Sequence, residues 1–82
     1  GVNQILELKN ETFKNLIKLE TLILTGNNIN LIEYDAFSNL TNLKMLDLNN
    51  NPIRRLDFMM NLQSLIEIGL LGCNLKAIER HF

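Results

Sequence analysis

Side chains suited to covalent or metal chemistry are sparse in this sequence. It contains one cysteine, Cys73, and one histidine, His81. A nucleophilic triad needs a base and a carboxylate positioned beside the nucleophile, and a structural zinc ion needs four nitrogen, sulfur or oxygen ligands. No partner is spaced to complete either site with His81, and Gly26, Gly69 and Gly72 form no phosphate-binding loop. The sequence therefore predicts a protein that is not an enzyme and has no cofactor or metal.

Asparagine or cysteine recurs instead at one polar position of an apolar pattern. The spacing Leu-x-x-Leu-x-Leu-x-x-Asn-x-Ile begins at Leu19 and again at Leu43, and it recurs with substitutions at Leu65. Its polar positions are Asn27, Asn51 and Cys73. A carboxamide both donates and accepts hydrogen bonds, so stacked copies can satisfy backbone groups in neighbouring turns. A thiol donates weakly and packs as a small apolar group. We expect these three residues to form a structural ladder.

The repeated pattern divides the chain into coils of similar length. The copies begin 24 residues apart (19 to 43) and then 22 apart (43 to 65). One repeat domain is therefore predicted over residues 1–82, with a partial repeat 1–18, repeats 19–42 and 43–64, and a partial repeat 65–82. Neither end carries a recognisable polar cap. Because the terminal units of a repeat stack normally need such caps, self-association through the open ends is expected.

Apolar periodicity indicates the path of each coil. Residues 21–25, 45–49 and 67–71 alternate with the period of a half-buried strand. The long connections between them favour parallel pairing, one strand per repeat. Phe13, Phe37 and Met59 are each followed three residues later by leucine, which suits a short helical or 3₁₀ turn. The predicted fold is an α/β solenoid with a parallel sheet of about three strands on the concave face and short turns on the convex face.

Residues 36–53, Ala-Phe-Ser-Asn-Leu-Thr-Asn-Leu-Lys-Met-Leu-Asp-Leu-Asn-Asn-Asn-Pro-Ile, resemble the 24-residue typical repeat of animal extracellular leucine-rich-repeat proteins. That group includes Toll and Toll-like receptors and insect immune repeat proteins. The resemblance implies a right-handed coil within a secreted or cell-surface recognition protein, with innate immunity as one role. The 22-residue copy is similar to shorter repeats of intracellular members. This similarity favours a cytoplasmic adaptor or regulatory subunit as the alternative. A structural spacer within a longer solenoid is compatible with all of these sequence features.

Charge and hydropathy narrow the class of partner. The formal net charge is −1, with eight basic and nine acidic residues, and no apolar run approaches the length of a membrane span. Neither nucleic acid nor membrane contact is expected. A protein or microbial ligand should instead bind the concave face, where Ile23, Met45 and Leu71 are apolar and Asp47 and Glu67 are acidic. The nine outward positions are Thr21, Ile23, Thr25, Met45, Asp47, Asn49, Glu67, Gly69 and Leu71.

Two Asn-x-Thr tripeptides are candidate N-glycosylation sites. They begin at Asn10 and Asn39. A glycan on Asn39, between two apolar residues of the convex arm, would leave the sheet uncovered.

Overall fold

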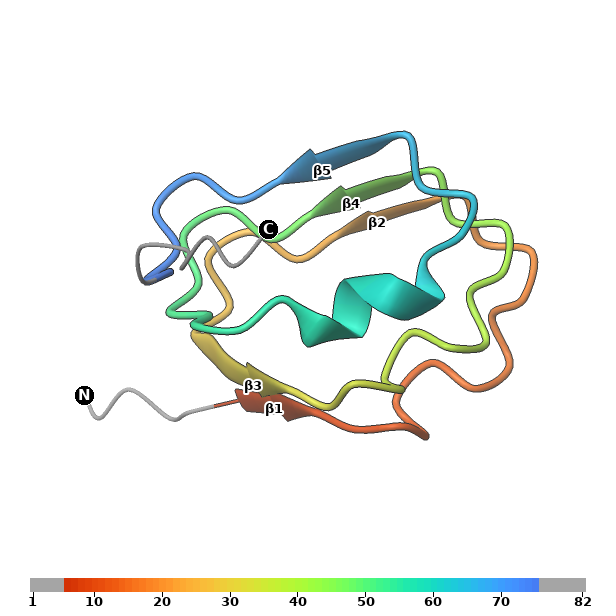
Figure 1. Cartoon of the computed structure of the whole chain (residues 1–82), viewed down its shortest axis with the longest axis horizontal. Helices are drawn as coiled ribbons and strands as arrows, with labels where there is room; N and C mark the ends of the chain where they lie inside the picture. Colours follow the sequence, from red (N-terminus) through yellow and green to blue (C-terminus); the bar gives the residue numbers. More distant parts are fainter. Residues whose placement is uncertain (1–5, 76–82) are drawn as a thin grey trace, which may run out of the picture.

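The computed structural model describes residues 6–75 as five short strands and one 3₁₀ helix (Figure 1). No α-helix is present in this range. The elements are β1 (Leu6–Leu8), β2 (Thr21–Ile23), β3 (Ile29–Ile32), β4 (Met45–Asp47), η1 (Asp57–Asn61) and β5 (Glu67–Gly69).

Three of the strands form a parallel sheet in the order β2-β4-β5. Leu22 pairs with Leu46 and Leu46 pairs with Ile68, so equivalent residues of successive repeats lie side by side. This confirms the predicted parallel sheet. The regular strands are three residues long rather than five, but the bonding continues beyond them. The Leu24 amide donates to the Asp47 carbonyl at 2.8 Å, and the Leu48 amide donates to the Gly69 carbonyl at 2.9 Å.

A second parallel sheet, formed by β1 and β3, was not predicted. It lies across the molecule from the three-stranded sheet (Figure 1). Leu8 pairs with Ile32, 24 residues later, whereas Leu6 pairs with Ile29, and the register shifts between Leu6 and Glu7. The buried side chains of Leu8, Ile29 and Ile32 point into the core. Repeat 19–42 therefore contributes one strand to each sheet, β2 to the three-stranded sheet and β3 to the two-stranded one.

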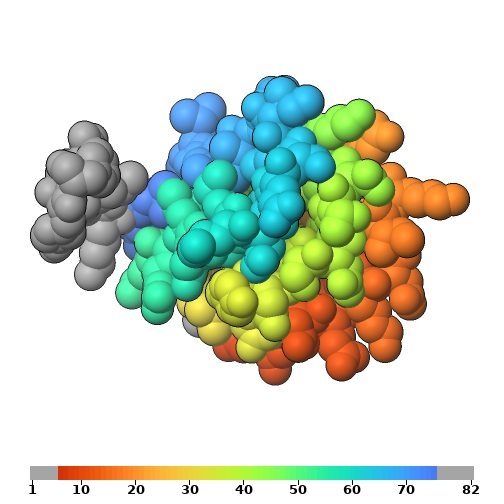
Figure 2. Space-filling model, turned by 45° about the vertical axis from the view of Figure 1, so that its right-hand side comes forward, coloured from red at the N-terminus to blue at the C-terminus, as the bar shows by residue number. Residues whose placement is uncertain are grey.

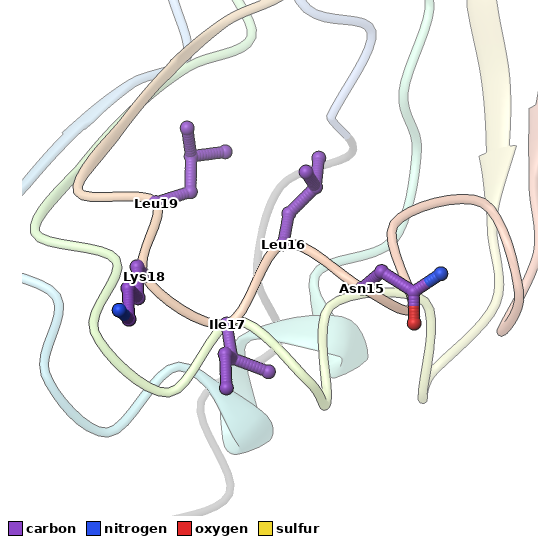
Figure 3. Close-up of a pocket in the computed structure, with 5 residues that line it drawn as sticks. All are labelled: Asn15, Leu16, Ile17, Lys18 and Leu19. Carbon is purple, nitrogen blue, oxygen red and sulfur yellow. The ribbon is translucent and has the colours of Figure 1, made fainter.

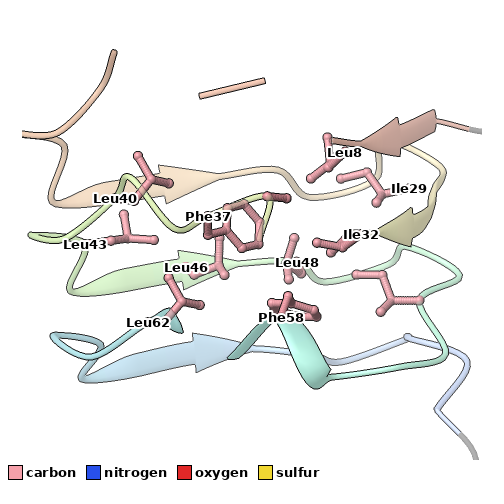
Figure 4. Close-up of a cluster of buried hydrophobic side chains, with 12 residues drawn as sticks. Leu8, Ile29, Ile32, Phe37, Leu40, Leu43, Leu46, Leu48, Phe58 and Leu62 are labelled. Carbon is pink, nitrogen blue, oxygen red and sulfur yellow. The ribbon is translucent and has the colours of Figure 1, made fainter. Parts of the chain in front are cut away.

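The hydrophobic core fills the space between the two sheets (Figure 4). Leu46 lies on β4 and Leu48 just beyond it, and both are fully buried. Side chains from the return connections complete the core, chiefly Phe37, Leu40 and Phe58. The alternating pattern read from the sequence thus separates the inward leucines from the polar and exposed residues between them.

Three aromatic rings stack through the coils. Phe13 and Phe37 are stacked, with ring centroids 5.7 Å apart and ring planes inclined by 23°, and Phe37 meets Phe58 edge to face at 5.5 Å. Phe58, not Met59 as the sequence suggested, takes the fully buried position in η1, while Met59 is half-buried. The shorter connection winds into a 3₁₀ helix that begins at Asp57 and turns Phe58 inward. The outer turns around Phe13 and Phe37 remain isolated turns rather than helices.

The chain leaves the sheet through residues with left-handed backbone. Gly26, Asn50 and Gly72, which are equivalent in the three repeats, have φ angles of 68°, 60° and 73°. Glycine and asparagine tolerate this conformation best. The Gly26 and Asn50 amides donate to the carbonyls of Asn49 and Leu71, so the turns stack in the same register as the strands.

Candidate binding face

The solvent side of β2, β4 and β5, which we call the sheet face, brings the nine predicted residues together. Strand register aligns Thr21, Met45 and Glu67 in one row. Ile23, Asp47 and Gly69 form the next. Thr25, Asn49 and Leu71 follow just beyond the strands, where the backbone hydrogen bonds keep the same alignment. All nine are exposed or half-exposed.

The apolar residues of the sheet face do not form one continuous patch. Ile23 is 61% exposed and is the diagonal neighbour of half-buried Met45 on the adjoining strand. Leu71, 76% exposed, lies two rows beyond Met45, about 13 Å in the strand direction, and one row and two strands away from Ile23. Ile23 and Met45 therefore make the apolar pair of this face, and Leu71 stands apart from it.

Three of the nine residues, Asp47, Asn49 and Gly69, have a role in the fold itself. Asp47 Oδ1 accepts a hydrogen bond from the Asn49 amide at 2.9 Å. Asn49 Oδ1 in turn accepts one from the Leu71 amide at 2.8 Å. A Cβ atom at position 69 would lie only 2.8 Å from Asn49 Oδ1, so Gly69 leaves the space that this carboxamide occupies. The side chains that remain for a partner contact are Thr21, Ile23, Thr25, Met45, Glu67 and Leu71.

The three ladder residues are bonded to very different extents. Asn51 is fully buried. Its Nδ2 atom donates to the backbone carbonyls of Leu24 (2.9 Å), Leu48 (3.0 Å) and Asn49 (3.2 Å). Its Oδ1 atom accepts hydrogen bonds from the backbone amides of Asn27 and Ile29, both at 2.9 Å. Asn27 is exposed and donates to the Thr25 carbonyl at 3.2 Å. The half-buried Cys73 thiol donates to the Leu48 carbonyl at 3.3 Å. Within residues 6–75, Asn51 is therefore the ladder residue with the most polar links between coils.

A second set of polar links, which the sequence reading missed, runs along the opposite side of the coils. In each link a side chain donates to a backbone carbonyl of the preceding coil: Asn39 to Lys14 (3.1 Å), Asn42 to Ile17 (2.8 Å), Asn61 to Tyr34 (2.7 Å) and Ser64 to Thr41 (2.8 Å). Figure 2 shows the successive coils as adjoining bands of colour. The sequence signal for two of these links, those of Asn39 and Asn61, is the Asn-Leu dipeptide that recurs at the equivalent residues 15, 39 and 61.

The two candidate glycosylation sites differ in environment. Asn10 is exposed in the turn after β1. Asn39 is half-buried, and its side-chain nitrogen is the donor to Lys14 just described.

Two hollows in the described surface lie away from the sheet face. One, of about 450 Å³, is lined by residues 15–19, with Leu16 and Leu19 pointing to one side of the chain and Ile17 to the other (Figure 3). The other, of about 440 Å³, lies beside the turns after the strands and is lined largely by asparagines. Neither presents a set of catalytic groups. Among residues 6–75, no three His, Cys, Asp or Glu side chains gather as metal ligands, and His81 lies outside the described residues.

No helix in the described part of the chain is long and apolar enough to cross a membrane.

Comparison with known proteins identifies the repeat. Residues 2–53 match the family model described as Leucine rich repeat, which covers the first partial repeat, repeat 19–42 and the sheet-forming part of the next. No curated protein and no solved structure matches the chain. The family has a solenoid-type fold, consistent with the short parallel strands, and its members generally mediate protein–protein interactions. On this match and this repeated geometry, the chain belongs to the leucine-rich-repeat family.

Proposed function

We propose that this chain recognises a protein ligand through the sheet face, as part of a secreted or cell-surface receptor. The observation that carries the proposal is the pair formed by Ile23 and Met45. Ile23 is 61% exposed on a strand whose inward residue, Leu22, already supplies the packing. An exposed apolar side chain beside a second one on a rigid strand is a suitable anchor for a partner.

The polar surroundings of this pair suit a partner with a basic or hydroxyl-rich rim. Thr21 and Glu67 lie on either side of Met45 in the first row, and Asp47 lies beside Ile23 in the second row. A central apolar contact with a polar border is the usual arrangement of a protein interface. No catalytic or cofactor role is part of the proposal.

The extracellular location and a role in innate immunity rest on the similarity of residues 36–53 to the typical extracellular repeat. An intracellular adaptor is the second candidate, favoured by the 22-residue spacing between Leu43 and Leu65. An extracellular receptor should bind a secreted or surface protein, whereas an intracellular adaptor should bind a cytosolic one. A single binding experiment with both sets of proteins therefore distinguishes the two candidates.

The experiment compares Ile23→Glu with Met60→Glu in the full-length protein. Met60 is 78% exposed on η1, away from the sheet face, and provides a matched apolar-to-acidic control. Each tagged protein is incubated with secreted and surface proteins of the source organism in one arm, and with its cytosolic proteins in the other. Captured proteins are purified, and their Kd for each variant is measured by surface plasmon resonance.

We expect a ligand in the secreted arm whose Kd rises at least about tenfold with Ile23→Glu and is unchanged with Met60→Glu, because a charge at a desolvated anchor is strongly unfavourable. Equal weakening by both variants, or none by Ile23→Glu, would exclude the sheet face. A sheet-face ligand found in the cytosolic arm alone would favour the adaptor. Circular dichroism of each variant checks that the fold is retained.

A further inference from the structure

We propose that Asn10, and not Asn39, is the residue of this chain that carries an N-linked glycan when the chain passes through a eukaryotic secretory pathway. Both residues begin an Asn-x-Thr tripeptide, so the hydroxyl residue does not distinguish them. Their environments in the folded chain do.

The turn that holds Asn10 presents its side chain to solvent. The turn is fixed by the Lys9 amide, which donates to Thr12 Oγ1 at 3.0 Å, and by the Asn10 amide, which donates to Glu33 Oε1 at 3.1 Å. Both bonds use backbone N–H groups. The Asn10 carboxamide forms no hydrogen bond within the described residues and is exposed. A bulky sugar on its Nδ2 atom therefore breaks no hydrogen bond within residues 6–75.

The Asn39 carboxamide is part of the packing between coils. Its Nδ2 atom, which is the atom that a glycan would modify, lies 3.1 Å from the Lys14 carbonyl oxygen in a half-buried site. Three residues on, Asn42 donates in the same way to Ile17 at 2.8 Å. The two bonds hold adjoining segments of neighbouring coils together. The first sugar ring would have to stand at this junction, so a glycan on Asn39 opposes the folded state.

The recurrence of asparagine accounts for Asn39 without glycosylation. Asn15, Asn39 and Asn61 occupy equivalent positions, and each precedes a leucine. Asn61 also donates to a carbonyl of the preceding coil, at 2.7 Å, although Gln63 rather than a hydroxyl residue follows two positions later. The tripeptide at Asn39 is thus completed by Thr41 at a position where asparagine has a structural function.

A glycan at Asn10 is also compatible with the proposed binding face. Asn10 follows β1, which lies across the core from β2, β4 and β5 (Figure 1). The sugar would project from the side of the molecule opposite the sheet face.

The test directs the full-length protein into the secretory pathway of cultured animal cells with a heterologous signal peptide, so that its outcome does not depend on the native location. Occupancy of each asparagine in the secreted, folded protein is measured by peptide mass spectrometry. We expect Asn10 to be occupied and the occupancy of Asn39 to be at least about tenfold lower. Similar occupancy at the two residues, or a bare Asn10, would overturn the proposal.

A matched control is available one coil earlier. Ile17→Thr completes the same Asn-Leu-Thr tripeptide at Asn15, whose side chain is exposed. The main chain of Ile17, which accepts the bond from Asn42, is retained in this variant. We expect Asn15 to be glycosylated in Ile17→Thr while Asn39 remains bare. If Asn15 were bare as well, the tripeptide or its neighbourhood in the chain, and not the bond to Lys14, would explain the difference, and the structural argument would fail.

Discussion

The carboxamide of Asn51 and the thiol of Cys73 occupy equivalent positions in successive coils, but their bonding is unequal. Asn51 forms five hydrogen bonds to backbone groups. Cys73 makes a 3.3 Å contact with the Leu48 carbonyl, the counterpart of the Asn51 bond to Leu24. The ladder is therefore strongest in the middle of the described stack, and substitutions along it should have graded effects.

Replacing Asn51 with alanine should strongly destabilise the fold. The substitution leaves buried carbonyls and amides without partners, and each such group costs about 1–3 kcal/mol. We expect the free energy of unfolding to fall by about 3 kcal/mol or more for Asn51→Ala, and by less than about 1 kcal/mol for Asn27→Ala, whose side chain makes one exposed bond within residues 6–75. Urea denaturation of both variants provides the measurement. An equal decrease in the free energy of unfolding for both variants would show that the buried hydrogen bonds of Asn51 stabilise the fold no more than the exposed bond of Asn27.

If Asn51→Ala does not fold, Asn51→Asp provides a second measurement. Aspartate keeps an acceptor for the amides of Asn27 and Ile29 but removes the donor to Leu24 and Leu48. It also places a charge in a fully buried site. Its stability should therefore rise as pH is lowered through the carboxyl titration, because the protonated acid can donate again. A pH-independent Asn51→Asp variant would contradict this account.

At Cys73, introducing an asparagine should stabilise the fold. An asparagine there could donate to the Leu48 carbonyl, as the thiol does, and also offer an oxygen to the Asn51 amide, as Asn51 does to the Asn27 amide. The Ile53 amide already donates to the Asn51 carbonyl at 2.7 Å. We expect Cys73→Asn to raise the free energy of unfolding by about 1 kcal/mol, whereas Cys73→Ala should lower it. Thermal unfolding of the two variants tests this pair. A loss of stability in Cys73→Asn comparable to that in Cys73→Ala would mean that the third coil has no room for a carboxamide.

The strand register was predictable because one residue type repeats at one spacing. Leu22, Leu46 and Ile68 are inward residues of equivalent strands, and their pairing follows from the 24- and 22-residue intervals. The buried position of Phe58 was not predictable in this way. A two-residue shortening can be absorbed at several points of the connection, and Phe58 and Met59 are both apolar neighbours, so only packing chooses between them.

Among the polar residues too, some structural roles were predictable from the sequence and others were not. The Asn51 position stood out because it is embedded in a leucine pattern. The links from Asn39, Asn42 and Ser64 were missed because asparagine and serine in a surface connection usually indicate turns, and nothing local reveals a carbonyl of another coil as their partner. On the sheet face, the alternating pattern indicates which residues point outward. It does not indicate that Asn49 accepts a hydrogen bond from the Leu71 amide, because that partner lies beyond the neighbouring strand.

Gly69 and Asn49 should be energetically coupled. A Cβ atom at position 69 would displace the Asn49 carboxamide and break its 2.8 Å bond to the Leu71 amide. We expect Gly69→Ala to destabilise the protein by about 1–2 kcal/mol, and by clearly less in an Asn49→Ala background, where no carboxamide stands in the way. A double-mutant cycle measured by urea denaturation gives the coupling free energy. Additive effects would indicate that Asn49 moves aside without loss.

Phe58 and Met59 offer a direct test of the aromatic stack. Phe58 is fully buried and meets Phe37 edge to face at 5.5 Å, whereas Met59 is half-buried on the same 3₁₀ helix. Truncation to alanine should therefore cost about 3–5 kcal/mol at Phe58 and clearly less at Met59, since a buried aromatic side chain leaves the larger cavity. Phe58→Leu, which keeps most of the apolar volume, should recover part of the loss. Unfolding free energies from urea titration decide the matter, and a larger loss for Met59→Ala than for Phe58→Ala would place Met59 in the core instead.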